Sequence, residues 1–157
     1  MSLERAKNHL MKYDLADRIM LSDQSTATVE LAAQAFGVEP GMIAKTLSFL
    51  VKEDGGIKPV LVIAEGMARI DNRKYKDTFH CKASMIPHDD VEKLIGHAVG
   101  GVCPFGAKPG VGIYLDESLK KWDTVYPAAG TDNSAVRLSI PELEKASEAI
   151  GWVDVCK

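Results

Sequence analysis

The fold of this chain is decided by residues 43–64, which read IAKTLSFLVKEDGGIKPVLVIA. Two runs rich in aliphatic and β-branched residues, 43–51 and 57–64, flank the segment EDGG at 53–56. Strand-forming runs joined by a short segment that contains Asp-Gly are typical of a β-hairpin. We therefore expect a β-hairpin in the middle of the chain.

Helical and strand patterns surround this hairpin on both sides. Apolar periodicity predicts helices at about 3–13, 29–36, 72–79, 87–96 and 140–150. Thr26 or Thr28 can cap the second of these helices and Asp71 the third, and Ser139 with Glu142 forms a capping box at the start of the last. Short apolar runs predict strands at 18–21, 111–115, 124–128, 135–138 and 152–155. Because strands and helices do not alternate strictly, we expect a single α+β domain spanning 1–157. Its mixed β-sheet, barrel-like or strongly twisted, would be flanked by helices.

The composition is that of a globular protein with a core of ordinary size. Of the 157 residues, 46% are hydrophobic and 26% are charged. No window approaches the ~20 apolar residues of a membrane span, and residues 1–5 lack the apolar core of a signal peptide. The three cysteines have no CxxC spacing, which argues against a disulfide framework and a structural zinc site. We therefore expect a cytoplasmic protein that uses no metal or cofactor.

The charge balance restricts the partners of the chain. Its formal net charge is −3, whereas proteins that wrap nucleic acid usually carry a basic excess. A local patch could still bind the end of a nucleic acid. The densest basic cluster contains Arg69, Arg73, Lys74, Lys76 and Lys82. It is either a solvated helix face or a set of phosphate contacts.

Lys45 is the first candidate for chemistry. In a strand over 43–51, side-chain alternation places Lys45 on the same face as Ile43 and Leu47. A lysine on an apolar face either extends its side chain along that face toward solvent or places its charge in a binding cleft. The pattern therefore indicates a functional lysine, with a surface lysine as the alternative.

The second candidate is the loop GGVCPFG at 100–106. Glycines let a backbone approach a ligand closely, and Pro104 restrains the loop. A rigid loop with free N–H groups and a cation nearby is suited to holding a carbonyl or phosphate oxygen. The alternative is an ordinary tight turn.

Two further features are weaker signals. The segment AAGTDN at 128–133 offers a close backbone approach and short polar side chains, but it is also typical of a hairpin turn. Cys103 could be a nucleophile, but no histidine has a recognisable spacing to it. We therefore interpret Cys103 as a small buried hydrophobe, and His97 as a helix cap or surface residue.

Taken together, three segments carry a resemblance. IAKTL at 43–47, GGVCPFG at 100–106 and AGT at 129–131, in this order and separation, resemble the YbaK-like family of aminoacyl-tRNA deacylases. This family also supplies the inserted editing domain of bacterial prolyl-tRNA synthetases. The Gly-x-x-x-Pro loop of the family maps onto Gly100 to Pro104, and its strand lysine maps onto Lys45. The likeness extends across nearly the whole chain and is strongest to the free-standing prolyl-tRNA editing branch.

The resemblance implies a trans-editing hydrolase that cleaves the ester of mischarged aminoacyl-tRNA, with tRNA-Pro carrying Ala, Cys or Ser as the expected substrate. It implies the acceptor end of the tRNA and prolyl-tRNA synthetase as partners. The implied catalytic residues are Lys45, Gly100, Gly101, Val102, Cys103 and Pro104. The implied substrate-binding residues are Thr46, Phe105, Gly106, Ala129, Gly130, Thr131 and Asp132.

The chemistry that follows from this resemblance needs no strong protein nucleophile. An aminoacyl ester is already activated, so N–H groups around Gly101 to Cys103 could polarise its carbonyl for attack by water. Lys45 could hold the terminal phosphate. Two alternatives remain open: a non-catalytic module that binds aminoacyl or nucleotide ligands or docks on a synthetase, and a cysteine-dependent hydrolase.

Overall fold

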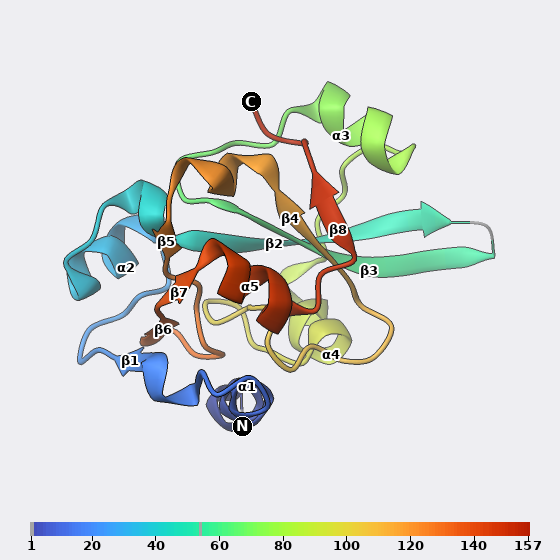
Figure 1. The fold of residues 1–157 in the computed structure, drawn as a ribbon. Helices are drawn as coiled ribbons and strands as arrows, with labels where there is room; N and C mark the ends of the chain where they lie inside the picture. Colours follow the sequence, from blue (N-terminus) through green and yellow to red (C-terminus); the bar gives the residue numbers. More distant parts are fainter. Residues whose placement is uncertain (1, 54) are drawn as a thin grey trace.

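A four-stranded mixed sheet lies at the centre of the structure, a computed structural model that describes residues 2–53 and 55–157 (Figure 1). The strands are β2 (Ala44–Glu53), β3 (Gly56–Glu65), β4 (Gly112–Asp116) and β8 (Gly151–Val153), in the spatial order β2-β3-β4-β8. β2 and β3 form the predicted antiparallel hairpin, and β4 and β8 add in parallel. The sheet is twisted and does not close into a barrel (Figure 1). Asp54, in the predicted hairpin turn, lies outside the described residues.

The hairpin separates two hydrophobic clusters, because successive side chains of a strand point to opposite faces. Leu61 and Ile63 of β3 face the larger cluster, whereas Val60 and Val62 face the smaller one. On β2, Ala44 belongs to the larger cluster, and Leu47 packs against the smaller one. Lys45 pairs with Ala64, a member of the smaller cluster, so the sheet separates its side chain from the larger core.

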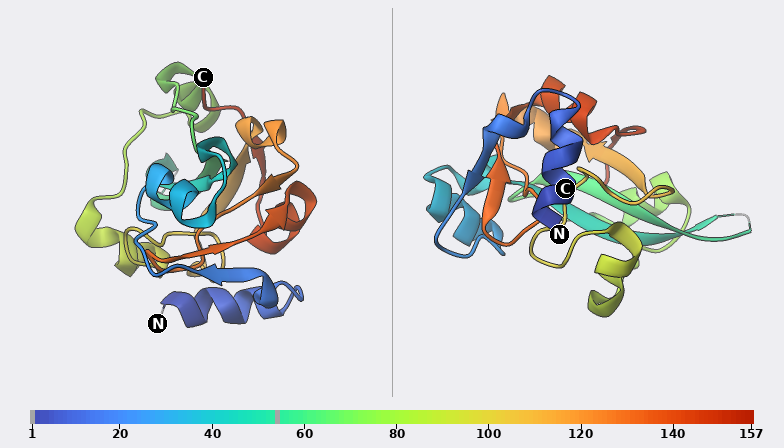
Figure 2. Two further views of the ribbon diagram at one scale, coloured as in Figure 1. Left: turned by 90° about the vertical axis from the view of Figure 1, so that its left-hand side faces the viewer. Right: turned by 90° about the horizontal axis from the view of Figure 1, so that it is seen from below.

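Helices cover both faces of this sheet. Three of them contribute to the larger cluster: α1 (Ser2–Met11), α4 (Val91–Ile95) and α5 (Ile140–Ser147). α3 (Asn72–Phe79) covers the smaller cluster through Tyr75, and α2 (Val29–Phe36) packs on Ile43. Figure 2 shows α1 along one end of the molecule beside β1 (Ile19–Leu21), with the C-terminus at the other end near α3. The expected α+β domain with a mixed, twisted sheet is therefore confirmed. No helix among residues 2–53 and 55–157 is long and apolar enough to cross a membrane.

Local sequence signals explain where the helices begin. The Thr28 hydroxyl caps α2 by accepting a hydrogen bond from the Leu31 N–H at 3.1 Å, and Asp71 caps α3. Ser139 and Glu142 form the predicted capping box of α5. Short 3-10 turns complete the connections, at Ala16–Arg18, Pro40–Met42, His88–Asp90 and Glu117–Lys121.

Several predicted boundaries differ from the structure: α1 ends at Met11, β5 (Thr124–Val125) is shorter than predicted, and the region 87–96 is divided into a 3-10 turn and α4. The last helix ends at Ser147 rather than at Ile150, because Glu148 adopts a left-handed conformation with φ of 58°. There its carboxylate accepts a hydrogen bond from the Tyr13 hydroxyl at 2.5 Å, a tertiary contact that the local sequence does not reveal. The strand predicted at 135–138 is divided into β6 (Ser134–Val136), which pairs with β1, and β7 (Leu138–Ser139), which pairs with β5 (Thr124–Val125).

Candidate active site

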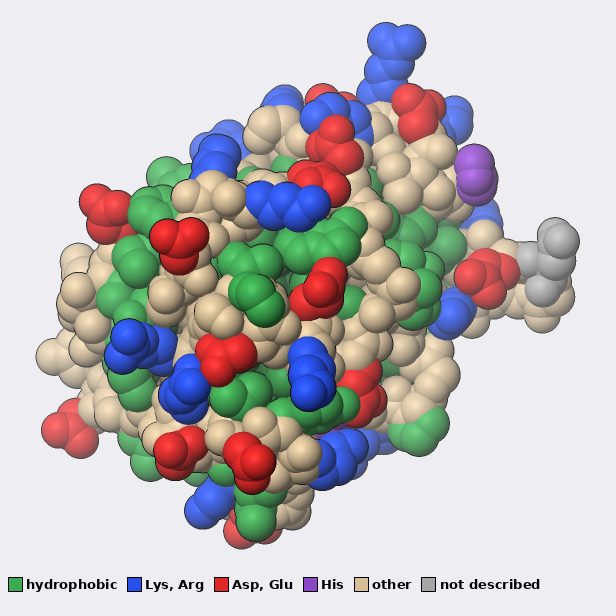
Figure 3. Space-filling view, viewed as in Figure 1, with side chains coloured by type: hydrophobic (Ala, Val, Ile, Leu, Met, Phe, Trp, Pro, Cys, Tyr) green, Lys and Arg blue, Asp and Glu red, His purple; other side chains and the backbone are tan. Residues whose placement is uncertain are grey.

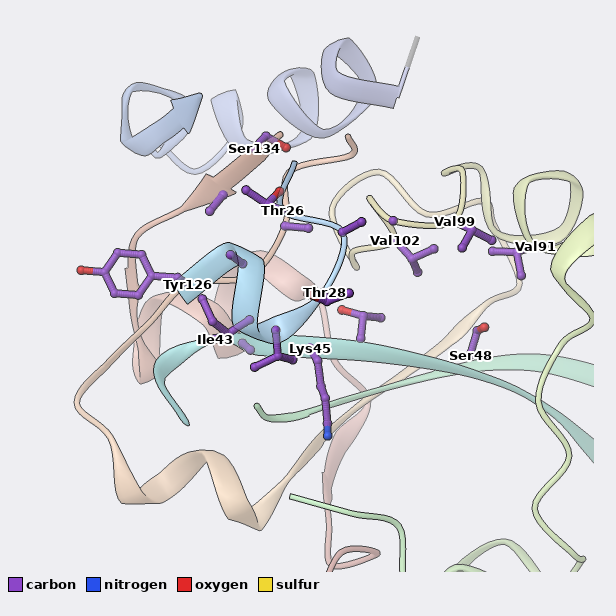
Figure 4. A pocket seen from close by; sticks show the side chains of 18 of the residues that line it. Thr26, Thr28, Ile43, Lys45, Ser48, Val91, Val99, Val102, Tyr126 and Ser134 are labelled. Carbon is purple, nitrogen blue, oxygen red and sulfur yellow. The ribbon is translucent and has the colours of Figure 1, made fainter. Parts of the chain in front are cut away.

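A cavity of about 360 Å³ opens between β2, the start of α2, α4 and the loop after α4 (Figure 4). This volume lies within the range of pockets that hold small ligands. Most of the wall is apolar, and its polar side chains include Thr26, Thr28, Thr46 and Ser48. The loop contributes Gly100 and Val102 to the wall. The cavity can therefore hold a small, largely neutral group next to backbone N–H groups.

The conformation of the loop depends on its glycines. Gly100 has a φ of +96°, a region that favours glycine. Gly101 has ordinary φ, but a Cβ atom on it would lie 2.5 Å from the carbonyl carbon of Gly130 and 2.6 Å from Cα of Thr131. The loop and the segment around Gly130, which the sequence singled out separately, therefore pack with their backbones in direct contact.

The hydrogen bonds of the loop identify its free donors. The Gly101 N–H is occupied, since it donates to Ala98 O at 3.0 Å. The N–H groups of Gly100 and Val102 have no protein acceptor within residues 2–53 and 55–157. Both residues line the cavity. The candidate oxyanion donors are therefore Gly100 and Val102. Of the other N–H groups expected from the sequence, that of Gly101 is occupied, and Cys103 does not line the cavity.

The segment at 129–132 supports the loop rather than lining the cavity. The Ala129 N–H donates to the Ser134 hydroxyl at 3.2 Å, and the Thr131 hydroxyl donates to the same atom at 2.8 Å. Asp132 accepts a hydrogen bond from the Thr26 N–H through its backbone oxygen. Ser134 lines the cavity, whereas Ala129 and Thr131 do not.

Cys103 and His97 form a buried pair behind the loop. Both side chains are fully buried, and Sγ of Cys103 lies 3.6 Å from Nε2 of His97. His97 Nε2–H donates to Phe105 O at 2.7 Å, so the ring holds the chain just after Pro104. Burial raises the pKa of the Cys103 thiol to about 12 and lowers the pKa of the His97 imidazole. The predicted burial of Cys103 is confirmed, and the prediction of His97 as a cap or surface residue is wrong.

The remaining loop residues point away from the cavity. Phe105 is fully buried in the larger cluster, next to Cys103. Pro104 and Gly106 line a second cavity of about 610 Å³ beside α1. Of the loop, only Gly100 and Val102 therefore face the space where a substrate would lie.

Lys45 is among the residues that line the cavity, but its ammonium group lies elsewhere. The side chain extends from β2 away from Val102 and Thr26 (Figure 4). Its Nζ donates to Gly66 O at 3.2 Å and also to Ala68 O. Burial lowers the pKa of this ammonium below its usual range. The lysine is thus held by backbone carbonyls on the face of β2 opposite the loop.

Sequence reasoning missed Thr26 as a cavity residue and considered it only as a helix cap. Its side chain is buried, and neither its hydroxyl nor that of Thr46 has a partner among the described residues. A buried hydroxyl without a partner costs about 1–3 kcal/mol, so both groups are suited to a polar ligand atom. No local sequence signal could have identified Thr26, because its position is fixed by a contact distant in sequence, in which the Thr26 N–H donates to Asp132 O.

The basic cluster on and beside α3 lies at one end of the molecule. Arg69, Arg73, Lys76 and Lys82 are exposed, whereas Lys74 forms an ion pair with Asp154 at 3.0 Å. In Figure 3, Lys and Arg side chains gather over this end but are interspersed with Asp and Glu. The part of the chain that the structure describes contains no group of three or more His, Cys, Asp or Glu side chains that could hold a metal ion.

The sequence of this chain is similar to that of a known protein family and of several known proteins. The sequence pattern of a family described as aminoacyl-tRNA editing domain matches residues 23–146. The uncharacterized protein YwhH of Bacillus subtilis (strain 168) is 42% identical over all of this chain and 98% of its own length. A relative from Enterococcus faecalis, EbsC, named as a proposed Cys-tRNA(Pro)/Cys-tRNA(Cys) deacylase, is 26% identical over 88% of this chain and 82% of its own.

A solved structure shows the same fold. It is described as a proposed trans-editing enzyme for prolyl-tRNA synthetase, and it superposes with a TM-score of 0.85 at 30% sequence identity. The match covers 99% of this chain and 97% of the other.

Proposed function

The chain belongs to the aminoacyl-tRNA editing domain family and is an aminoacyl-tRNA deacylase, and we propose that it acts in trans on tRNA-Pro that carries a small, wrong amino acid such as Ala, Cys or Ser. The observation that carries this proposal is a largely apolar cavity lined by Gly100 and Val102, two residues whose N–H groups have no acceptor among the described residues. The relatives whose names refer to Cys-tRNA(Pro) and prolyl-tRNA synthetase support tRNA-Pro as the substrate. This activity belongs in the cytoplasm, where tRNA-Pro is charged.

The two free N–H groups are the proposed oxyanion site. The ester carbonyl of the substrate lies in the cavity with its oxygen toward Gly100 and Val102. Negative charge develops on this oxygen as the carbonyl is attacked. Preorganised donors therefore stabilise the transition state more than the bound substrate. The contact of Gly101 with the Gly130 segment holds both donors in place.

Water is the proposed attacking group. Cys103 is sealed in the core, and its raised pKa leaves the thiol protonated at neutral pH. His97 already donates to Phe105 O and does not reach the cavity. An aminoacyl ester is an activated acyl group, so positioning and oxyanion stabilisation suffice, with the free ribose hydroxyl of the substrate assisting the water.

The cavity wall favours a small neutral side chain. The unpaired hydroxyls of Thr26 and Thr46 can accept hydrogen bonds from the α-ammonium group of the aminoacyl ester. The apolar side chains of Ile43, Val91 and Val102 surround the rest of the space. A mostly apolar wall of this kind favours a small, uncharged side chain over a large or charged one. A second, hydrolytic site is needed because a synthetase separates near-isosteric amino acids only weakly by binding.

We further propose that Lys45 contacts the terminal phosphate of the tRNA. Two of its protons are held by Gly66 O and Ala68 O, which leaves one for a phosphate oxygen. Arg69 is exposed one residue after Ala68, so the phosphate would meet two cations at this edge. The exposed cations of α3 then lie along the path of the acceptor end.

A panel of mischarged tRNAs tests this function. The purified protein is mixed with a large excess of tRNA-Pro bearing Ala, Ser, Cys or Pro, and released amino acid is followed over time. We expect many turnovers with at least one small non-cognate amino acid and little hydrolysis of the Pro ester. Stoichiometric binding without turnover on every member of the panel would instead establish the alternative, a non-catalytic aminoacyl-binding or synthetase-docking module.

A further inference from the structure

Helix α1 lies outside the part of the chain that matches the editing-domain family, which begins at residue 23. It nevertheless packs directly behind the proposed active site. Ala6 and Leu10 are fully buried in the same cluster as Cys103 and Phe105. Figure 2 shows the helix as a continuous element along this end of the molecule. The helix is therefore in a position to influence the loop without lining the substrate cavity.

Two glycines show how closely α1 approaches the loop. A Cβ atom on Gly96, just before the loop, would lie 2.8 Å from Nε of Arg5. One on Gly106, at the end of the loop, would lie 2.7 Å from the backbone oxygen of Arg5. Arg5 thus lies between Gly96, at the end of α4, and Gly106, at the end of the loop, and a larger residue at either glycine would displace it.

A third glycine connects α1 to the segment that supports the loop. A Cβ atom on Gly130 would lie 2.6 Å from the carbonyl carbon of Ser2. Gly130 in turn contacts Gly101. The first turn of α1 therefore touches both backbone segments that set the positions of the free N–H groups.

Hydrogen bonds fix this arrangement. Arg5 Nε–H donates to Gly106 O, while His97 Nε2–H donates to the neighbouring carbonyl, Phe105 O, at 2.7 Å. Two consecutive carbonyls after Pro104 are thus held by two side chains. At the other end of α1, His9 Nε2 bonds to Ala146 O at 2.6 Å and ties the helix to α5.

From this geometry we propose that Arg5 is a positioning residue for the deacylation reaction. Its Nε–H holds Gly106 O, and through it the loop that presents the N–H groups of Gly100 and Val102. The inference rests on the proposed function, because it assigns those N–H groups to the oxyanion. Arg5 does not line the substrate cavity, so its loss should lower kcat and leave KM nearly unchanged. A displacement of ~1 Å at the reacting groups can cost about 10²-fold in rate.

A different role for Arg5 would be a direct contact with tRNA. Arg5, Lys12 and Lys108 line the second cavity, where three cations could meet a phosphate. Glu148 also lines this cavity and lies 3.7 Å from the Lys12 ammonium, which offsets part of the charge. A phosphate contact would appear in KM and would weaken with added salt, whereas a positioning role would do neither.

Two substitutions at Arg5 separate the hydrogen bond from the charge. Gln carries an N–H donor at the same position along the side chain as Nε of Arg, but no charge. Met has a similar length and no donor. We expect Arg5→Met to lower kcat by about tenfold or more with KM within about twofold, and Arg5→Gln to keep most of kcat. Lys7, exposed on the same helix, supplies the control Lys7→Met, which should behave like the wild type.

Amide hydrogen exchange gives a readout that does not depend on activity. The Gly101 N–H should exchange about tenfold faster in Arg5→Met than in the wild type or in Arg5→Gln, because its bond to Ala98 O depends on the loop conformation. Exchange at Leu61, in the centre of β3, should not change, which would exclude global destabilisation.

The two readouts distinguish the possible failures. An inactive wild type with this exchange pattern would refute the proposed function and retain the structural role of Arg5. Unchanged kcat and Gly101 exchange in Arg5→Met would overturn the inference. Equal, salt-dependent rises in KM for the Met and Gln variants would also overturn it, in favour of a tRNA contact.

Discussion

Substitution of Gly101 by Ala should separate the two backbone segments that frame the candidate active site. The added Cβ would lie 2.5 Å from the carbonyl carbon of Gly130 and 2.6 Å from Cα of Thr131. An ordinary carbon–carbon contact needs about 3.5 Å, so the segments must move apart by ~1 Å. Both are backbone, so no side chain can rotate to relieve the overlap. Overpacking of this kind costs about 1–3 kcal/mol of stability.

The effect on catalysis should exceed the effect on stability. A shift of ~1 Å moves the N–H groups of Gly100 and Val102 away from the oxyanion, and loss of an oxyanion donor costs on the order of 10²–10³ in rate. The assay is single-turnover deacylation of mischarged tRNA-Pro by protein shown to be folded by thermal unfolding. Gly151→Ala is the matched control, because a Cβ there meets no atom within 4 Å. A folded Gly101→Ala protein with a rate within about threefold of the wild type would show that the contact between the loop and the Gly130 segment does not position the N–H groups for catalysis.

Three other predictions concern charge and pH. Lys45→Met should lower kcat/KM by about 10–100-fold, because a charge-assisted contact to phosphate is worth roughly 1.5–3 kcal/mol. The control is Lys52→Met, at an exposed position on the same strand. Equal activity of the two variants would exclude the phosphate contact. Burial lowers the pKa of His97 in the folded protein below the value of about 6.5 that it has in the unfolded chain. Between the folded and the unfolded pKa the unfolded chain binds more protons, so the free energy of unfolding decreases as the pH drops through this range. The melting temperature of the wild type should therefore fall more between about pH 7.5 and about pH 5.5 than that of His97→Gln, and parallel losses would contradict this assignment. Binding of uncharged tRNA should be weak, and the logarithm of its binding constant should fall with the logarithm of the salt concentration with a slope of ~0.7 per phosphate contacted. Tight binding that does not depend on the salt concentration would exclude a site restricted to the acceptor end.

The fold could be predicted in outline because its local signals are strong. The two runs around the EDGG segment gave the central hairpin, and Thr28, Asp71 and the Ser139 capping box gave helix starts that the structure confirms. The prediction failed where a tertiary contact decides the outcome. Glu148 ends α5 early through its contact with Tyr13, which is distant in sequence.

The same limit applies to the candidate site. Alternation along β2 correctly separated Lys45 from Thr46, but it could not show that the Lys45 ammonium binds the carbonyls of Gly66 and Ala68. Thr26 and His97 gave no usable signal, because one reaches the cavity and the other the core only through packing between distant segments. A sequence pattern indicates which residues share a face, whereas hydrogen-bond partners across the chain depend on the completed fold.

In the proposed mechanism the backbone of the loop, and not the Cys103 thiol, supports hydrolysis. The most direct test measures Cys103→Ala and Gly101→Ala side by side on the same mischarged tRNA-Pro, with both proteins folded and monodisperse. We expect Cys103→Ala to keep most of the wild-type rate and Gly101→Ala to lose about 10²-fold or more. An inactive Cys103→Ala together with a fully active Gly101→Ala would exclude this mechanism in favour of cysteine nucleophilic catalysis.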